Sequence, residues 1–454
     1  MDELRCDVCV IGAGSGGLSV AAGAVQMGAS VVLIEGHKMG GDCLNYGCVP
    51  SKALLSAAQS GQDFVSAKDY VAQTIAAIEP HDSQERFEGL GCTVIRDFAQ
   101  FVSPSVVQAG GKLIRARRFV IATGSSPFIL PIEGIETVDV HTNETIFGLR
   151  EKPEHLIIIG GGPIGIEMAQ AHRQFGCDVT VIEGARILGN EDREAAEVVK
   201  AALIGRGVTI LENCKAARIS SENGVTVYTE NGPVVGTHLL VAAGRQANVE
   251  KLNLAAAGID HDRKGIHVDA GLRSISNRKV YAIGDVAGGM QFTHLAGYHA
   301  GVIVRSILFG LPAKARTDHI PRVTYTAPEL AQIGPTEAEA LKKFGALLSV
   351  HRVDFEDNDR AVASGSTVGF LKLMVVKGRP VGVTIVGPQA GELIAMWAMA
   401  IANRTKLSFI TNTVLPYPTL AEINKRAASA YFTPKLFESP LVKRVVGLVQ
   451  RLLP

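Results

Sequence analysis

The sequence lacks a surplus of either charge, and this absence limits its possible binding partners. Its 454 residues include 45 lysines and arginines and 44 aspartates and glutamates, which gives a net charge of +1. Nucleic-acid-binding proteins normally concentrate a basic excess on one face, so nothing here favours nucleic-acid binding. Hydrophobic residues make up 47% of the chain, which excludes intrinsic disorder. The length is sufficient for roughly three domains.

Long apolar segments and a secretory signal are also missing. No stretch reaches the roughly 18 uncharged apolar residues that a membrane-spanning helix needs. Met1–Cys9 has no basic segment before its short apolar run. The seven cysteines are odd in number and irregularly spaced, which argues against a disulfide framework. We therefore expect a cytoplasmic protein whose thiols are reduced unless a pair is catalytic.

Glycine, by contrast, is abundant, and its 49 residues gather in a few clusters. The first cluster, 12–17, follows the apolar run 8–11 and precedes the stretch 18–27, whose small residues favour a helix. A second apolar run, 31–34, ends at Glu35. This order of strand, glycine turn, helix and strand is typical of a parallel nucleotide-binding unit.

Each glycine of this turn has a physical reason to be present in a dinucleotide site. Gly12 would make the tight turn, Gly14 would let the backbone approach a pyrophosphate, and Gly17 would allow close packing of helix on strand. The N-terminus of the following helix offers unpaired N–H groups to the phosphates. Glu35 would accept hydrogen bonds from a ribose diol. The alternative is a purely structural turn, which the surrounding pattern disfavours.

The same pattern occurs a second time. The apolar run 155–159 leads into Gly160, Gly162 and Gly165, and the next strand ends at Glu183. Two dinucleotide sites in one chain imply two cofactors and electron transfer between them. A carboxylate at Glu183 accepts hydrogen bonds from a 2′-hydroxyl but repels a 2′-phosphate, so NAD(H) is favoured over NADP(H).

Three more apolar strands each end in a glycine beside a polar residue. They run into Thr123-Gly124, Gly244-Arg245 and Gly284-Asp285. From His319 onward the character changes, because prolines interrupt the chain and runs such as 370–376 predict antiparallel strands. A helix is predicted over 392–402. These features indicate a further domain at about 319–454.

The most specific signal is the segment 40–52, in which Cys43 and Cys48 are separated by four residues. Two such thiols, directly after a nucleotide-binding unit, predict a redox-active pair. On a regular helix this spacing would place the side chains about 140° apart, so the backbone must bend, as Gly47 and Pro50 allow. The alternatives are inert thiols and a metal site, although zinc would need two more ligands close by.

Together these motifs resemble those of the class I pyridine nucleotide-disulfide oxidoreductases, a flavoprotein family that includes lipoamide dehydrogenase, glutathione reductase and mercuric reductase. The resemblance covers essentially the whole length. Besides the two glycine turns and the cysteine segment, it rests on Ala122-Thr123-Gly124, Gly244-Arg245, Gly284-Asp285 and Tyr325-Thr326-Ala327-Pro328-Glu329.

The resemblance implies an α/β fold with two Rossmann-like dinucleotide-binding domains, for FAD and NAD, and an α+β C-terminal dimerisation domain. The expected boundaries are 1–150 for the FAD-binding domain, 151–268 for the NAD(P)-binding domain, 269–318 for a return segment of the FAD-binding or central domain, and 319–454 for the dimerisation domain with an amphipathic C-terminal helix.

Cofactors and residue roles follow from the same resemblance. FAD would be held by Gly12, Gly14, Gly17, Glu35, Gly41, Thr123, Gly124, Gly284 and Asp285, and NAD by Gly160, Gly162, Gly165, Glu183, Gly244 and Arg245. Cys48 would face the flavin as a charge-transfer thiolate, and Cys43 would attack the substrate disulfide. Lys52 and Glu167 would pair near the flavin N5. No metal is expected.

The last motif departs from the family pattern. Relatives acting on lipoamide or glutathione resemble one another in a His-Pro-Thr segment with a glutamate five residues after the histidine, whereas here Tyr417 replaces the histidine and Glu422 is retained. Tyrosine is a poor base at neutral pH but a capable hydrogen-bond donor. In a homodimer, Tyr417 and Glu422 of one subunit would complete the thiol site of the other. Alternatively, Tyr417 only packs at the dimer interface.

We therefore expect an FAD-dependent enzyme, similar to dihydrolipoamide dehydrogenase, that transfers electrons between NAD(H) and a small disulfide or dithiol substrate or a lipoyl-carrying protein. The alternatives are a mercuric- or quinone-reductase-like flavoenzyme and a membrane- or complex-bound electron-transfer flavoprotein. Mercuric reductase resembles this chain in its tyrosine at position 417. Its family, however, carries a C-terminal thiol pair, whereas Cys214 is the last cysteine here.

The C-terminal segment 441–453 is amphipathic at helical spacing. One arc of roughly 120° carries Lys443, Arg444, Gly447, Gln450 and Arg451. Aliphatic residues cover the rest of the circumference. Residues 421–454 hold six basic and two acidic side chains, a local net charge of +4. Such a helix fits an anionic membrane surface on the cytoplasmic side, a partner protein, or its own dimer.

Overall fold

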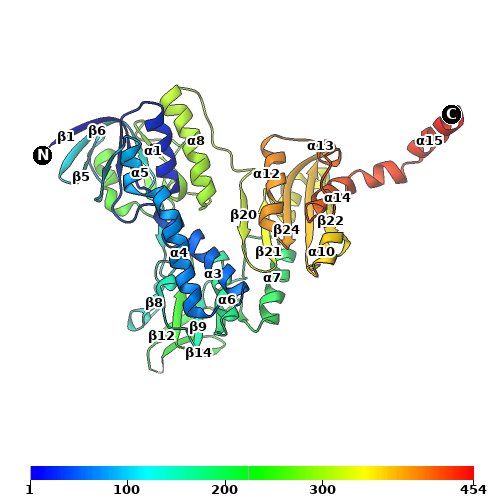
Figure 1. Cartoon of the computed structure of the whole chain (residues 1–454), viewed down its shortest axis with the longest axis horizontal. Coiled ribbons are helices and arrows are strands. Elements are labelled where there is room, and N and C mark those ends of the chain that lie inside the picture. Colours follow the sequence, from blue (N-terminus) through cyan, green and yellow to red (C-terminus); the bar gives the residue numbers. More distant parts are fainter. Residues whose placement is uncertain (1, 223, 454) are drawn as a thin grey trace. The chain divides into compact units, whose positions relative to one another are not determined.

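The structure is a computed structural model that describes residues 2–222 and 224–453. Figure 1 colours the chain along its sequence and labels its elements. Packing divides the chain into two units. The first is Met1–Gly184 with Val208–Arg316, and the second is Ala185–Gly207 with Thr317–Pro454. Each unit is thus built from two separate stretches of the sequence.

The first unit contains a largely parallel sheet with the strand order β3-β2-β1-β6-β5-β4, in which β19 also pairs with β6. These strands are β1 (Glu3–Ile11), β2 (Val31–Ile34), β3 (Thr93–Ile95), β4 (Gln100–Ser103), β5 (Val106–Ala109), β6 (Lys112–Ile121) and β19 (Val280–Ala282). β1 pairs in parallel with β2 and β6, whereas β4 and β5 are antiparallel additions. Because β19 is parallel to β6, the chain returns to this sheet late in the unit.

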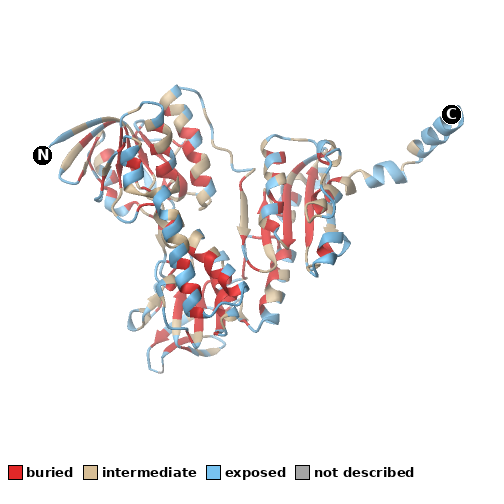
Figure 2. Ribbon diagram, in the orientation of Figure 1, coloured by how far each residue is buried: buried red, intermediate tan, exposed pale blue. Residues whose placement is uncertain are grey.

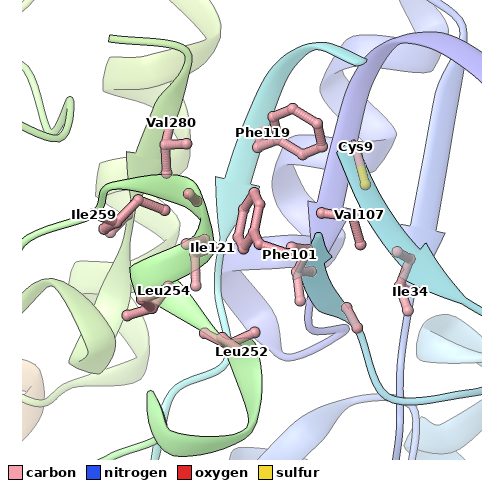
Figure 3. Packing of buried hydrophobic residues seen from close by; sticks show 14 of the residues in the cluster. Cys9, Ile34, Phe101, Val107, Phe119, Ile121, Leu252, Leu254, Ile259 and Val280 are labelled. Atoms are coloured by element: carbon pink, nitrogen blue, oxygen red, sulfur yellow. The ribbon is translucent and has the colours of Figure 1, made fainter. Parts of the chain in front are cut away.

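Both faces of this sheet are covered, as its continuous apolar strands require. Side chains of β1 alternate between the faces, so Val8 packs in one cluster with α1 (Ser15–Gln26) and α8 (Thr293–Phe309), and Cys9 packs in another. Figure 3 shows the second cluster, where aromatic side chains of the sheet meet aliphatic side chains of the segment 252–259. The sheet is therefore a rigid base for the loops at its strand ends.

A second sheet of the same unit is parallel throughout, in the order β11-β10-β9-β15-β8. Its strands are β8 (Val140–His141), β9 (His155–Ile159), β10 (Asp178–Ile182), β11 (Thr209–Leu211) and β15 (His238–Val241), and α6 (Pro163–Gln174) connects β9 to β10. A small antiparallel sheet consists of β12 (Ala216–Ser220), β13 (Val225–Thr229) and β14 (Gly232–Gly236).

The remaining elements of the first unit are short connections, apart from α3 and α4. They are α2 (Gly41–Asn45), α3 (Cys48–Gln59), α4 (Phe64–Asp82), α5 (Gln84–Gly89), β7 (Ser125–Pro127), β16 (Arg245–Ala247), β17 (His261–Asp262), β18 (Gly265–Ile266) and the 3-10 turns η1 (Ile135–Thr137), η2 (Ile146–Gly148), η3 (Glu250–Leu252), η4 (Leu254–Ala257) and η5 (Gly284–Ala287).

The repeated unit of strand, glycine turn, helix and strand is confirmed at both predicted places, as β1-α1-β2 and as β9-α6-β10. The predicted start of the first helix was wrong by three residues, because α1 already begins at Ser15, inside the glycine cluster. The predicted α/β architecture is confirmed by the two parallel sheets. The boundaries expected at 150 and 268 stay predictions, because the first unit contains both sheets.

The second unit is organised around an antiparallel sheet with the order β20-β21-β24-β23-β22. Its strands are β20 (Pro321–Thr324), β21 (Glu329–Ile333), β22 (Leu348–Asp354), β23 (Phe370–Val376) and β24 (Arg379–Gly387). Its helices include α9 (Glu337–Phe344), α10 (Asp359–Ala363), α11 (Ala390–Leu393), α12 (Ala395–Ala402), α13 (Leu407–Thr411) and α14 (Glu422–Ala430), with the 3-10 turns η6 (Gly345–Leu347) and η7 (Phe355–Asp357). The antiparallel strands are as predicted, and the helix predicted over 392–402 is divided at Ile394.

One helix of the second unit comes from far upstream in the sequence. Residues 185–207, which contain α7 (Arg193–Gly205), were expected within the NAD(P)-binding domain, but they pack with the C-terminal sheet against β21 and β24. Lys372 of β23 lies 3.2 Å from Asp192, 3.0 Å from Glu194 and 2.8 Å from Glu337. Because Lys372 and Asp192 are both almost completely buried, this ion cluster attaches α7 firmly to the sheet.

The chain ends in η8 (Pro434–Glu438), a π-helical turn, and α15 (Pro440–Leu452). α15 is the helix that the amphipathic pattern predicts. Over residues 2–222 and 224–453, no helix is both long and apolar enough to cross a bilayer.

Candidate functional site

The two cysteines of the predicted redox pair lie on either side of a break between two helices. Cys43 belongs to α2, which ends at Asn45, and Cys48 is the first residue of α3. Between them, Tyr46 and Gly47 leave the helical conformation, with φ values of −142° and −120°. The predicted bend of the backbone is thus confirmed. Both cysteines are free thiols in this structure.

The two thiols have opposite proton affinities. A hydrogen bond from the Cys43 thiol is the largest of the effects that lower the pKa of Cys48 to about 6, and the nearby Thr293 and Lys52 act in the same direction. The same interaction with Cys48 raises the pKa of Cys43. Cys48 also begins a helix, where the backbone dipole favours an anion. At neutral pH the pair therefore holds one proton, and Cys48 is the thiolate.

Thr293 is a site residue that the sequence motifs did not reveal. It is the first residue of α8, and its Oγ1 lies 3.4 Å from the Sγ of Cys48. Its position depends on a contact between segments 245 residues apart in the chain, and no local pattern marks it.

Lys52 and Glu167 form an ion pair next to the cysteines. The Nζ of Lys52 lies 2.8 Å from the Oε2 of Glu167, and the carboxylate is buried whereas the lysine is about one-third exposed. The pair joins α3, which carries Cys48, to α6, which follows the second glycine turn. Lys52 therefore brings a positive charge, held in position by Glu167, close to the Cys48 thiolate.

The first glycine turn is shaped by packing at two of its three positions. A Cβ at Gly12, where φ is +104°, would lie 2.4 Å from the carbonyl oxygen of Ala122, and one at Gly17 would lie 1.9 Å from the oxygen of Gly12. A Cβ at Gly14, in contrast, would meet nothing closer than the Cα of Gly41 at 3.9 Å. The chain's own packing explains the first and third glycines but not the second.

The second glycine turn repeats this arrangement. A Cβ at Gly160 would lie 2.4 Å from the oxygen of Ala242, and one at Gly165 would lie 2.0 Å from the oxygen of Gly160. A Cβ at Gly162 would meet nothing within 4 Å. In both turns a Cβ at the central glycine would clash with no atom of the chain, and this glycine precedes a helix N-terminus, where a pyrophosphate needs close access to backbone N–H groups.

The two carboxylates that follow these turns are both attached to them. The Oε2 of Glu35 accepts a hydrogen bond of 2.6 Å from the backbone of Ala13, and its Oε1 accepts one of 2.7 Å from His37. The Oε2 of Glu183 accepts one of 2.7 Å from Gly161. A carboxylate fixed in this way keeps further lone pairs with which to accept hydrogen bonds from ribose hydroxyls.

Arg245 is attached to the loops of the first sheet. Its guanidinium donates to the hydroxyl and the carbonyl of Ser125 at 2.8 and 2.7 Å, and lies 3.1 Å from Asp42. Ser125 in turn donates to Asp285 at 2.6 Å, and Asn143 donates to Asp42 at 3.1 Å. The predicted role of Arg245 in binding the nicotinamide cofactor stays a prediction. Its contacts Ser125 and Asp42 belong to segments next to the first sheet, not to the second glycine turn. Sequence reasoning missed Asp42, Ser125 and Asn143.

Asp285 is a half-buried carboxylate of η5, the turn that follows β19, and its partial burial raises its pKa. Gly284 precedes it, and the backbone N–H of Gly284 donates to the Nδ1 of His299 at 3.2 Å. Thr123 and Gly124 follow β6, where the Thr123 hydroxyl donates to the carbonyl oxygen of Asn248 at 2.7 Å. These residues follow strands of the first sheet, the usual place for a ligand in such a fold, and Gly41 begins α2.

Tyr417 and Glu422 lie in the second unit. The Tyr417 side chain is 68% exposed, and its hydroxyl donates to the Oδ2 of Asp359 at 2.8 Å. Asp359 also lies 3.7 Å from Arg426. This hydrogen bond raises the pKa of Tyr417, which makes the tyrosine an even poorer base than the free side chain. Glu422 begins α14, and Asp359, which the sequence did not indicate, is the direct partner of Tyr417.

Comparisons with family models and with known proteins all point to the same enzyme family. The family model described as pyridine nucleotide-disulphide oxidoreductase matches residues 6–300, and that of the corresponding dimerisation domain matches residues 320–428. The chain is 32% identical to a mercuric reductase of Lysinibacillus sphaericus, over 95% of this chain and 83% of that protein. It is 33% identical to a dihydrolipoyl dehydrogenase of Geobacillus stearothermophilus, over 94% and 96% of the two chains.

A solved structure of similar fold is the Cu(II) complex of the HOCl-induced flavoprotein disulfide reductase RclA from Escherichia coli. It aligns with a TM-score of 0.87 at 30% identity, over 94% of this chain and 99% of that one.

Proposed function

Because the chain belongs to the pyridine nucleotide-disulphide oxidoreductase family, we propose that it uses FAD to move two electrons between NAD(H) and a disulfide or dithiol substrate through Cys43 and Cys48. Family membership makes it a flavoprotein disulfide oxidoreductase. The observation that carries the specific proposal is the cysteine pair, in which one thiol has a strongly lowered pKa beside a fixed lysine.

FAD fits the residues of the first nucleotide unit. The missing side chain at Gly14 would let the pyrophosphate approach the backbone, Glu35 would accept from the adenosine ribose, and the half-buried Asp285 would accept from the ribityl hydroxyls. FAD held by these residues would supply two-electron redox chemistry that links the nicotinamide to the sulfur pair.

The two cysteines are sufficient to reduce a disulfide substrate by thiol–disulfide exchange. In the reducing direction, the Cys43 sulfur attacks one sulfur of the substrate disulfide while its proton passes to the departing sulfur, so that a mixed disulfide forms and one substrate thiol leaves. The Cys48 thiolate then attacks the Cys43 sulfur, which forms the Cys43–Cys48 disulfide and releases the second thiolate. The substrate gains two electrons, and the enzyme dithiol loses them. Lys52 stabilises the Cys48 anion before this attack.

NAD(H) is the proposed nicotinamide. The carboxylate of Glu183, fixed to the second turn by the N–H of Gly161, would accept from a 2′-hydroxyl and would repel the dianionic 2′-phosphate of NADP(H). Gly162 and the N-terminus of α6 would receive the pyrophosphate. The match to a dimerisation domain supports a homodimer. A lipoyl group is one proposed substrate, and a cytoplasmic location suits a dithiol that must be reduced to act.

A second candidate is reduction of a metal ion or quinone by the same dithiol and flavin. The observation that favours it is the similarity to a mercuric reductase, combined with Tyr417 in place of a histidine. Cys214 is the last cysteine of the chain, so no thiol follows it to deliver a soft metal ion to the site.

Anaerobic titration of the FAD-loaded protein with NADH tests the proposed function. We expect a long-wavelength charge-transfer band after two-electron reduction, because the Cys48 thiolate would lie against the flavin. The band should disappear as the pH falls through about 6, where Cys48 becomes protonated, and it should be absent in Cys48→Ser. NADH should reduce the enzyme faster than NADPH.

Steady-state assays with lipoamide, glutathione disulfide, Hg(II) and a quinone then distinguish the substrate classes. Cys6→Ser, which removes a half-buried thiol of the first strand, serves as the matched control and should keep the band. A wild-type enzyme that shows no band, or a band that survives in Cys48→Ser, would contradict the proposed role of this sulfur. Turnover of Hg(II) or quinone alone would favour the second candidate.

Tyr417 is expected to assist turnover as a neutral hydrogen-bonding group. Since Asp359 raises its pKa, Tyr417→Phe should lower disulfide turnover by only about 2- to 10-fold, which is the worth of one hydrogen bond. Asp359→Asn should lower the pKa of Tyr417, measured by ultraviolet titration of tyrosinate. Neither variant should change the rate of reduction by NADH. Tyr70→Phe, at another exposed tyrosine, is the control. A loss of about 1000-fold in Tyr417→Phe would indicate that the tyrosine acts as the base.

A further inference from the structure

The C-terminal helix α15 presents an apolar face that its own unit does not cover. No described residue of α15 is buried, and Figure 2 shows the helix in the colour of exposed residues. Its aliphatic side chains are exposed by 42% to 76% at Leu441, Val445, Val446, Leu448, Val449 and Leu452. The segment that directly precedes it, η8, adds the exposed Phe437. The apolar surface therefore extends over η8 and α15.

All charged side chains on the polar side of the same helix are positive. At 100° per residue, the aliphatic side chains lie on one side and Lys443, Arg444 and Arg451 on the other. Between Ser439 and Leu453 the sequence has no acidic residue. Any partner of this helix must therefore accept apolar side chains and three positive charges along about 20 Å of helix.

α15 lies outside the part of the chain that the family models match. The match to the dimerisation domain ends at residue 428, and α15 begins at Pro440. Within the second unit, the buried core is completed by residues up to Ala428, with Tyr431 and Phe432 packed at its edge. The fold is thus closed before α15 begins, and the helix contributes no residue to this core.

We propose that α15 is a peripheral anchor that lies in the surface of a membrane rich in anionic lipids, with the aliphatic side chains among the acyl chains and the cations at the phosphates. The combination of a wide aliphatic face with Lys and Arg opposite is the pattern of helices that lie in the interface plane. Anionic lipid phosphates would pair with these cations, whereas a second copy of α15 offers no acidic residue to pair with them. This inference is independent of the enzyme's substrate.

Co-sedimentation with lipid vesicles tests the proposal on the full-length, FAD-loaded protein. We expect binding to vesicles of equal parts phosphatidylcholine and phosphatidylglycerol, weak binding to phosphatidylcholine alone, and loss of binding at high salt. Val445→Gln with Leu452→Gln removes apolar surface without changing the charge, and should reduce the bound fraction at least about fivefold. Lys443→Gln with Arg444→Gln and Arg451→Gln should remove the preference for the anionic vesicles.

Leu347→Gln with Val368→Gln makes the same chemical change at two exposed positions of the same unit outside α15, and should bind like the wild type. Absence of binding to anionic vesicles would overturn the proposal, and so would binding that the α15 variants do not weaken. Sedimentation velocity without lipid measures whether α15 instead binds another copy of the chain. If α15 drives association beyond a dimer and the vesicles do not bind, the occupant of this face is another copy of the chain.

Discussion

Cys43→Ser is expected to lower the turnover of a disulfide substrate by about 10³-fold or more, because no mixed disulfide can form without the attacking sulfur. Reduction of the flavin by NADH should remain near the wild-type rate, since hydride transfer does not need this thiol. Measuring the two half-reactions separately by stopped flow therefore assigns the defect to the sulfur step. A variant that keeps more than about one-tenth of the turnover would show that Cys43 is not the interchange thiol.

Comparing Cys43→Ser with Cys43→Ala tests the electrostatic part of the same argument. The hydrogen bond from Cys43 is the largest effect that lowers the pKa of Cys48. Serine still offers a donor, whereas alanine does not. The charge-transfer band should therefore persist to lower pH in Cys43→Ser than in Cys43→Ala. Identical titration curves for the two variants would mean that Lys52 and the helix N-terminus, not the neighbouring thiol, hold the Cys48 anion.

Lys372→Met is expected to destabilise the second unit by about 3–5 kcal/mol, because it leaves the buried Asp192 carboxylate without its cation. Trp397 is the only tryptophan of the chain and is fully buried in this unit, so its fluorescence reports unfolding there in urea. Lys342→Met, at an exposed lysine of α9, should change the stability by less than about 0.5 kcal/mol.

Asp192→Asn provides the compensating variant for Lys372→Met. The Oδ1 of Asp192 accepts from the backbone N–H groups of Glu194 and Ala195 at the start of α7, and asparagine keeps an acceptor for them while it removes the charge. The double variant should therefore recover part of the lost stability. A loss below about 1 kcal/mol in Lys372→Met alone would show that the ion cluster is well hydrated and contributes little.

The parts of this molecule that could be predicted from the sequence are those that local patterns specify. The turn at Gly12–Gly17 could be recognised because a tight turn and close packing leave no room for a side chain at its first and last positions. The bend between Cys43 and Cys48 followed from helix geometry alone. The strands β2, β9 and β23 have the predicted ends, since apolar runs with turn residues on both sides specify them.

The residues that sequence reasoning missed act over long distances in the chain. Thr293 reaches Cys48, and Asp359 reaches Tyr417, across intervening segments whose paths only the folded chain defines. The same holds for α7. Its pattern is that of an ordinary amphipathic helix, and nothing in that pattern states which of two sheets its apolar side will cover.

The C-terminal sheet packs against α7, a helix that is synthesised more than 100 residues before its strands. Ala195, Val199 and Leu203 leave the ribosome long before β21 and β24 are synthesised, so their apolar surface must wait for a strand partner. A separately expressed fragment that begins at residue 317 would lack this helix and would leave Lys372 without Asp192 and Glu194. Because the order of synthesis separates α7 from its sheet, we expect such a fragment to be less soluble than the full-length chain.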